Sequence, residues 1–204
     1  LTLYTGDFID DDDGIAPVAA LLARMPRTQG AYAVLGNHDY RRLGRSDGHN
    51  DVPRLRAALA DAGLELLFNA ARPLCGGELF VAGVDDPAIK RDDIDRAMSS
   101  VPDGACCLLL AHSPDILLRL GPHRPGLILA GHTHGGQIHL PFIGPLKTET
   151  KLGRRWAMGL REHDGVPIFV TRGIGYSGIN LRLGCPAEVA LLTLRSPLAA
   201  ECAA

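Results

Sequence analysis

The chain alternates short apolar runs with segments whose apolar residues recur at helical spacing. The short runs are bounded by Gly, Asp or Pro, which predicts β-strands, and the spaced segments predict helices. The predicted strands are residues 1–5, 32–35, 79–84, 105–111, 127–130, 168–171 and 189–194. The predicted helices are residues 16–25, 52–62, 93–100 and 115–120. Strands that alternate with helices predict an α/β fold, to which the last third of the chain adds further β-structure.

Length and composition predict a single globular domain over residues 1–204. Apolar residues make up 46% and charged residues 22%, and no repeat or low-complexity linker divides the chain. No apolar run approaches the roughly 20 residues needed to span a membrane. Five cysteines without a C-x-x-C spacing argue against a disulfide framework and favour a reducing compartment.

The charge of the chain argues against nucleic acid as a partner. The formal net charge is −2 and no basic block occurs, so we expect no nucleic-acid-binding surface. The first residue, Leu1, already lies within a predicted strand. We therefore expect the natural protein to continue upstream of Leu1, and an upstream signal or membrane anchor stays open.

Polar clusters follow four of the predicted strands. They are Gly6-Asp7, Gly36-Asn37-His38-Asp39, Ala111-His112-Ser113 and Gly131-His132-Thr133-His134. Because the carboxyl ends of parallel strands meet at one edge of a sheet, these side chains are expected to gather there. The set offers imidazole, carboxylate and amide ligands but no thiolate. That favours a manganese, iron or zinc site over a structural cysteine-type zinc site.

Each cluster also has a simpler interpretation. An Asp after a strand commonly serves as a turn or helix-cap residue, and Asn37 suits a plain Gly-Asn turn. His112 alone is typical of a histidine that is hydrogen-bonded at a strand end. The joint occurrence of all four clusters at strand ends favours a metal site.

The four clusters resemble the motifs of the calcineurin-like metallophosphoesterases. The matching residues are Gly6-Asp7-x-x-Asp10, Gly36-Asn37-His38-Asp39, Ala111-His112-Ser113 and Gly131-His132-x-His134. Further runs at residues 84–87, 135–138 and 171–175 are similar to bacterial phosphodiesterases of the YkuE/YaeI type. The resemblance implies two packed β-sheets flanked by helices, a four-layer sandwich.

The resemblance also implies roles for individual residues. Asp7 would bridge two divalent metal ions of manganese, iron or zinc. Asn37, His112 and His132 would complete the shell of one ion, and His134 would bind the other. The Asp-x-His motif that opens the family pattern is absent, so we expect one metal site to be incomplete and the first βα unit of the fold to be missing from this chain.

The implied reaction is hydrolysis of a phosphoester, with a phosphodiester favoured, by a metal-bound hydroxide at a dinuclear site. His38 would protonate the leaving oxygen, and Asp10 would orient His38. Arg172 is a candidate phosphate contact, although a solvated loop arginine fits equally well. His139 is a candidate substrate-pocket residue.

The substrate could be a small-molecule or a lipid-linked phosphoester. We expect a cytoplasmic or peripheral membrane location. The alternative function is a non-catalytic scaffold or binding protein on the same fold with a degraded metal site.

Overall fold

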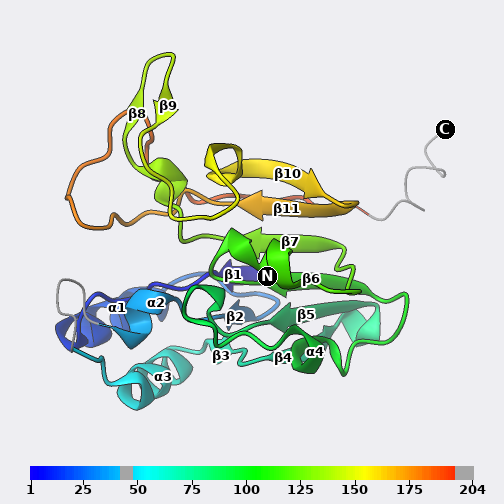
Figure 1. The fold of residues 1–204 in the computed structure, drawn as a ribbon. Helices are drawn as coiled ribbons and strands as arrows, with labels where there is room; N and C mark the ends of the chain where they lie inside the picture. The colour runs from blue at the N-terminus through cyan, green and yellow to red at the C-terminus, as the bar shows by residue number, and fades with distance from the viewer. Residues whose placement is uncertain (42–47, 196–204) are drawn as a thin grey trace.

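The structure is a computed structural model that describes residues 1–41 and 48–195, and its strands form two sheets and a small ribbon (Figure 1). The first sheet is parallel and has the order β1-β2-β3; its strands are β1 (Thr2–Tyr4), β2 (Ala31–Ala33) and β3 (Glu65–Leu66). A separate antiparallel ribbon consists of β8 (His139–Leu140) and β9 (Gly144–Pro145).

The second sheet has six strands in the order β10-β11-β7-β6-β5-β4. The four central strands run parallel, and an antiparallel strand borders them on each side. The bounds are β4 (Ala70–Leu74), β5 (Leu79–Gly83), β6 (Cys106–Leu110), β7 (Leu127–Ala130), β10 (Gly159–His163) and β11 (Val166–Val170).

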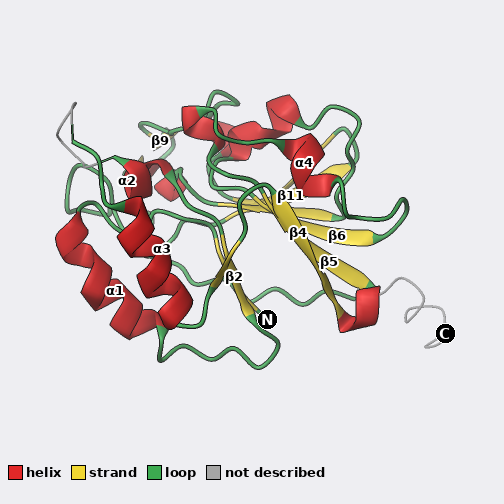
Figure 2. Ribbon diagram, turned by 90° about the horizontal axis from the view of Figure 1, so that it is seen from below, coloured by secondary structure: helices red, strands yellow, loops and turns green. Residues whose placement is uncertain are grey.

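Helices cover the outer faces of both sheets (Figure 2). The two longest, α1 (Ile15–Leu22) and α3 (Val52–Asp61), pack on the first sheet. On the second sheet lie α4 (Ile94–Met98) and the 3-10 helix η4 (Pro114–Arg119). The remaining short helices are α2 (Asn37–Tyr40), η1 (Asp12–Gly14), η2 (Cys75–Gly77), η3 (Pro87–Ile89), η5 (His134–Gly136) and η6 (Arg154–Trp156).

Three apolar layers hold these elements together. Ala33 belongs to the layer between the first sheet and α1 and α3, whereas its neighbour Val34 belongs to the layer between the two sheets. Leu109 and Leu110 of β6 divide in the same way between the outer and the inner face of the second sheet. Because successive strand residues point to opposite faces, strands buried on both faces must be apolar throughout. The four-layer α/β sandwich that was expected is confirmed.

The predicted strand over residues 189–194 is wrong. This segment has no strand structure, and its residues Val189 and Leu191 are exposed. The segment is apolar, as a buried strand would be, but β7 and β10 already occupy both sides of β11. The predicted helix over residues 115–120 is a 3-10 helix rather than an α-helix.

Two edge strands and the short strand β3 were not predicted. The edge strand β4 contains Pro73, and β10 is mostly exposed and polar, so neither shows the apolar pattern of a central strand. Both features are compatible with an edge, where one side of the strand needs no hydrogen-bonding partner.

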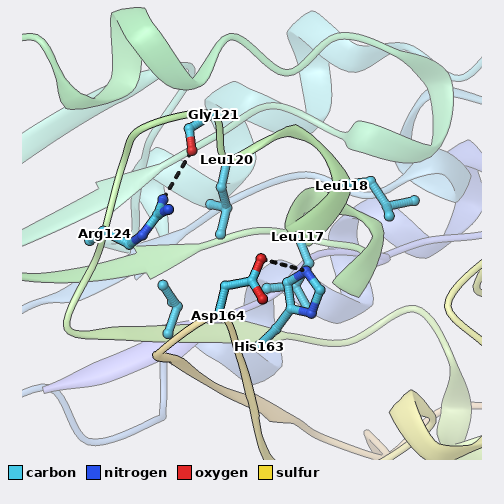
Figure 3. A pocket seen from close by; sticks show the side chains of 8 residues that line it. Leu117, Leu118, Leu120, Gly121, Arg124, His163 and Asp164 are labelled. Carbon is cyan, nitrogen blue, oxygen red and sulfur yellow. Dashed lines mark hydrogen bonds and ion pairs between the residues drawn. The ribbon is translucent and has the colours of Figure 1, made fainter.

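The described cysteines, residues 75, 106, 107 and 185, are all free thiols, and Cys202 lies outside the described residues. None of the helices in the described ranges has the length and hydropathy needed to cross a membrane. A hollow beside η4 and the β10–β11 turn has a volume of about 80 Å³. Leu117 and His163 are among the side chains that line it (Figure 3). This volume is well below the roughly 300 Å³ at which ligand pockets begin, so the hollow is not a candidate substrate site.

Candidate metal centre

The candidate metal centre lies where loops from both sheets meet. Asp7 follows β1, and Asn37 opens α2 just after β2, so the first sheet supplies two side chains. His112 follows β6 and His132 follows β7, so the second sheet supplies two more. All four loops leave the carboxyl ends of parallel strands, as the sequence pattern predicted.

Three of these side chains converge on one point. Nε2 of His112 lies 3.1 Å from Oδ2 of Asp7 and 3.0 Å from Nδ1 of His132. One ligand atom from each of Asp7, His112 and His132 lies within 4.8 Å of the others. A carboxylate oxygen and two ring nitrogens at these separations form a group that could hold a divalent cation.

The tautomer of His112 is set by the backbone. Its Nδ1 lies 2.6 Å from the carbonyl oxygen of Thr5, which can only accept, so Nδ1 carries the proton and donates it. Nε2 is therefore the ring nitrogen that faces Asp7 and His132, and it can act as a metal ligand once it has lost its proton. Histidines that bind metals characteristically donate their other ring N–H in this manner.

Asn37 adds an oxygen donor beside this group. Its Oδ1 is buried, and no hydrogen-bond partner for it exists among the described residues. A buried amide oxygen without a partner is unfavourable by roughly 1–3 kcal/mol. A cation at the centre would satisfy this oxygen, so the donor set fits a divalent metal ion.

The electrostatics of the site favour positive charge at the same point. Burial lowers the pKa of His112, but the Asp7 carboxylate beside it outweighs this effect and raises the pKa to about 9. Burial raises the pKa of Asp7, yet His112 and His38 hold it well below its usual range. Burial and the charge of His112 lower the pKa of His132 to about 3. One positive charge is therefore stabilised where the ligands converge.

A fully buried carboxylate, that of Asp39, organises the loops that carry Asp7 and Asn37. Its Oδ2 accepts the backbone N–H groups of Asp7 at 2.9 Å and Gly36 at 2.8 Å. Its Oδ1 accepts those of Phe8 at 2.7 Å and Ile9 at 3.2 Å. Burial and the charge of Asp7 raise the pKa of Asp39 to about 7, while the N–H groups act in the opposite direction.

Glycine is required where the loops touch. A Cβ on Gly36 would overlap Oδ1 of Asp7 and lie 2.5 Å from Cε1 of His112. Gly6 has a φ of +93°, and a Cβ there would lie 2.5 Å from the backbone nitrogen of Gly36. Asp7 and His132 themselves have φ values of 58° and 67°, so both ligands sit on backbone that disfavours their side chains.

The predicted catalytic pair lies next to the centre. Nδ1 of His38 is 3.2 Å from Oδ1 of Asp10, and the backbone N–H of His38 donates to Oδ1 of Asp7 at 2.9 Å. His134 follows His132 in η5 and lies outside the converging group of three. Burial lowers the pKa of His134.

The two predicted substrate contacts are engaged within the protein. The guanidinium group of Arg172 donates to Oε2 of Glu188 at 2.6 and 3.0 Å. Nε2 of His139 is paired with the carbonyl oxygen of Gly135. Their roles toward a substrate therefore stay predictions.

Two important carboxylates were missed from the sequence. Asp39 was part of a motif but received no role, because its four N–H donors come from two loops that only the fold brings together. Asp86 is fully buried, its Oδ2 has no hydrogen-bond partner in the described structure, and burial raises its pKa to about 6. Asp86 lies after a strand end and within the run over residues 84–87 that resembles the bacterial phosphodiesterases, but it received no role.

Comparisons with known proteins show which family the chain resembles. The family model for calcineurin-like phosphoesterases matches residues 1–136, two thirds of the chain. The uncharacterized metallophosphoesterase YkuE of Bacillus subtilis is 30% identical over 202 residues, covering 96% of this chain and 68% of that protein. For the uncharacterized metallophosphoesterase YkoQ of the same organism the identity is 34% over 191 residues, with 91% and 68% covered. Phosphodiesterase YaeI of Escherichia coli is 29% identical over 206 residues, with 95% and 70% covered. No solved structure gives a significant match.

The role of Asp39 can be tested by replacing it with asparagine. In Asp39→Asn, the new NH₂ group faces two backbone N–H donors, so two hydrogen bonds are lost. We expect the free energy of unfolding in urea to fall by about 2–4 kcal/mol, together with the affinity for Mn²⁺. Asp13→Asn, which neutralises an exposed acid of the next turn, should leave both unchanged. Equal stability of the two variants would contradict this account.

The close approach at Gly36 gives a second prediction. Gly36→Ala places a methyl group against Asp7 and His112, so we expect Mn²⁺ binding measured by calorimetry to be lost. The matched control is Gly175→Ala, because a Cβ at Gly175 meets nothing within 4 Å. Wild-type Mn²⁺ affinity in Gly36→Ala would show that the side chains can separate without loss of the site.

Proposed function

The chain belongs to the calcineurin-like phosphoesterase family, and we propose that it hydrolyses a phosphodiester at the centre formed by Asp7, Asn37, His112 and His132. The observation that carries the proposal is the convergence of Asp7, His112 and His132 on one point beside the buried, unpartnered oxygen of Asn37. A relative named as a phosphodiesterase supports the choice of a diester.

The donor set fits manganese, iron or zinc, which accept mixed nitrogen and oxygen ligands. We propose that Asp7, Asn37, His112 and His132 hold one divalent ion and that Asp7 and His134 contribute to a second. Such ions, when bound, supply Lewis acidity toward the phosphoryl oxygens and activate water at neutral pH.

The proton for the leaving oxygen is proposed to come from His38. Nδ1 of His38 has no hydrogen-bond partner in the described structure, but Oδ1 of Asp10 lies 3.2 Å from it, at ion-pair distance. In this proposal the Asp10 carboxylate would orient the ring and leave Nε2 available for the substrate. The main chain of His38 is fixed on both sides: its N–H donates to Asp7, and its carbonyl accepts from Nδ2 of Asn50 at 2.8 Å. A proton donor held in this way loses little freedom when the substrate binds.

Arg172 and His139 are proposed as substrate contacts within a single domain over residues 1–204. Arg172 would exchange its partner Glu188 for a phosphoryl oxygen, a bidentate pairing that guanidinium groups favour. His139 borders η5 through its contact with Gly135, next to His134. Arg172 borders the same residue, since a Cβ on Gly135 would lie 2.6 Å from its Cγ, so both side chains lie beside η5.

We further propose that the substrate is lipid-linked and that the protein acts at the membrane surface. Apolar side chains are exposed on the β8–β9 ribbon, including Phe142 and Ile143, and on the loop that pairs with it through Leu183. The ribbon projects away from the sheets (Figure 1). Exposed apolar side chains backed by cations are typical of interfacial membrane binding. The cations that follow the ribbon are Lys147, Lys151, Arg154 and Arg155.

Loss of His38 should affect poor leaving groups most. For His38→Ala we expect a fall of ~10²–10⁴-fold in turnover of an alkyl phosphodiester, because its alkoxide needs the proton. An activated aryl diester should lose much less, and metal content should not change. Steady-state kinetics on both esters and elemental analysis provide the measurement, with His123→Ala as the control, since His123 is a partly exposed histidine that pairs with Asp95 rather than with the metal centre.

Equal losses on both esters would mean that His38 does not donate the leaving-group proton. Absence of any hydrolysis by the metal-loaded wild-type protein would instead favour the non-catalytic scaffold.

The membrane proposal predicts an effect of the ribbon tip. The double variant Phe142→Ser/Ile143→Ser should bind vesicles of phosphatidylcholine and phosphatidylglycerol at least about tenfold more weakly in co-sedimentation. The reason is that the variant lacks the two apolar side chains that would insert into the bilayer. Leu118→Ser removes an exposed leucine from η4 and should have no effect. Unchanged sedimentation of the double variant would argue against docking through β8–β9.

A further inference from the structure

Besides the metal centre, the structure has a concave site along one edge of the large sheet. His112 lies at the same edge. The site is a cleft of about 450 Å³, a volume typical of ligand sites. We call it the basic cleft, since four cationic side chains line it. Its lining residues are Arg56, Phe68, Asn69, Asp85, Lys90, Arg91 and Arg96.

Strand register places the basic cleft near the metal centre. Gly83 of β5 pairs with Leu110 of β6, so Asp85 and His112 each lie two residues beyond a register pair. Ala70 of β4 pairs with Gly83, which puts Asn69 at the same edge. Neighbouring strands lie about 5 Å apart, so the cleft begins one to two strand spacings from His112.

The acidic side chain in the lining of the cleft does not neutralise its cationic side chains. Asp85 is the one acidic residue in its lining, and its Oδ2 accepts from Nε of Arg91 at 2.8 Å. No ion pair of Arg56, Lys90 or Arg96 is found in the described part of the chain. The cleft thus carries about three uncompensated positive charges in a chain whose net charge is −2.

Nearby acidic side chains are turned to other partners. Asp92 pairs with Arg119 at 2.8 Å, and Asp95 pairs with His123 at 2.7 Å. The carboxylate of Asp93 accepts the backbone N–H of Arg96 as the N-cap of α4. The positive charge of the cleft is therefore available to a ligand.

Two of the three arginines of the cleft, Arg56 and Arg91, are held in place. The guanidinium carbon of Arg56 lies 4.1 Å from the ring centre of Phe68, and that of Arg91 lies 4.5 Å from the ring centre of Tyr40. Nδ2 of Asn69 donates to the carbonyl oxygen of Arg91, while its Oδ1 accepts the N–H of Asp85. Side chains already ordered in this way lose less entropy on binding an anion.

One short helix joins the cleft to the metal centre. Tyr40 is the last residue of α2, which also carries Asn37 and His38, and its hydroxyl donates to Oδ1 of Asp85 at 2.6 Å. The side chain of Asp85 is only 6% exposed, so this contact is buried. The same helix therefore positions a metal ligand, the proposed proton donor and a wall of the basic cleft.

We propose that the basic cleft binds a second phosphate group of the substrate, a phosphomonoester or pyrophosphate group separate from the scissile diester. The inference rests on the proposed hydrolysis for its place in the reaction, but the cleft itself is defined by its own residues. Arg56 and Arg96 would contact this group, with Arg91 held between Asp85 and Tyr40 as a third donor. The substrate class is then a phosphodiester that carries a further phosphate.

The binding test uses the metal-free full chain and inorganic pyrophosphate in calorimetry. The double variant Arg56→Gln/Arg96→Gln should weaken pyrophosphate binding by about tenfold or more, because two charge-assisted contacts are lost. The control Arg24→Gln/Arg54→Gln removes the same charge from exposed positions outside the cleft, one of them on the same helix as Arg56, and should bind like the wild type. Equal weakening in both double variants, or no binding by the wild type, would overturn the proposal.

The kinetic test compares bis(p-nitrophenyl) phosphate with a p-nitrophenyl diester whose second alcohol bears a phosphate. The ratio of kcat/KM for the phosphorylated ester to that for the simple ester should fall about tenfold in Arg56→Gln/Arg96→Gln and should not change in the control. An unchanged ratio in the cleft variant would overturn the role in the reaction. Pyrophosphate binding without hydrolysis of either ester would refute the proposed function and leave the cleft standing.

Discussion

The buried carboxylate of Asp39 is the constraint on which the metal centre depends. It accepts four backbone N–H groups, three from the loop after β1 and one from the loop after β2. Without these bonds the turn that carries Asp7 would have several unsatisfied donors, and its positive φ would be unsupported. The charge that Asp39 adds is unfavourable beside Asp7, so the arrangement is more stable when positive charge occupies the centre.

The second requirement is contact between the two sheets. His112 belongs to the large sheet, but its Nδ1 donates to Thr5 at the end of β1 in the small sheet. Gly131, after β7, also faces this strand, since a Cβ there would lie 2.7 Å from Oγ1 of Thr5. The ligands from the two sheets therefore converge only when the sheets pack. Formation of the site is thereby coupled to the apolar layer between the sheets, which contains Val34 and Leu110.

The sequence predicts those elements whose burial gives them a regular pattern of apolar residues. The central strands are buried on both faces and read as apolar runs, so their positions and the sandwich they form could be predicted. The edge strand β4 could not, because Pro73 and exposed residues are tolerated at an edge. The segment over residues 189–194 shows the converse, since it is apolar like a strand but pairs with none, and both sides of β11 are already occupied by β7 and β10.

The functional residues also differ in how far the sequence predicts them. Asp7, Asn37, His112 and His132 could be proposed because each follows a predicted strand within a short motif. Asp39 lies in such a motif too, but its function depends on three N–H groups that are 30 to 32 residues away in sequence. The sequence did not predict the basic cleft, because its cations come from three separate segments. The net charge of the chain adds these cations to distant acidic residues and so does not reveal a local basic site.

Charge is sorted along the shared edge of the large sheet. Imidazole groups gather beyond β6 and β7, where His112 and His132 meet Asp7 from the small sheet, and cations gather beyond β5 and the start of β4. Asp85 and Asp86 mark the boundary: Asp85 is paired with Arg91, whereas Asp86 is buried on the side of His112. The metal centre and the basic cleft have opposite intrinsic charge and lie at adjacent strand ends. The acidic metal centre would therefore repel an anionic ligand unless cations occupy it. Once cations occupy the metal centre, the whole edge favours anions. A ligand with two phosphate groups would then gain binding free energy at both the metal centre and the basic cleft, whereas a ligand with one phosphate would gain it at only one of them.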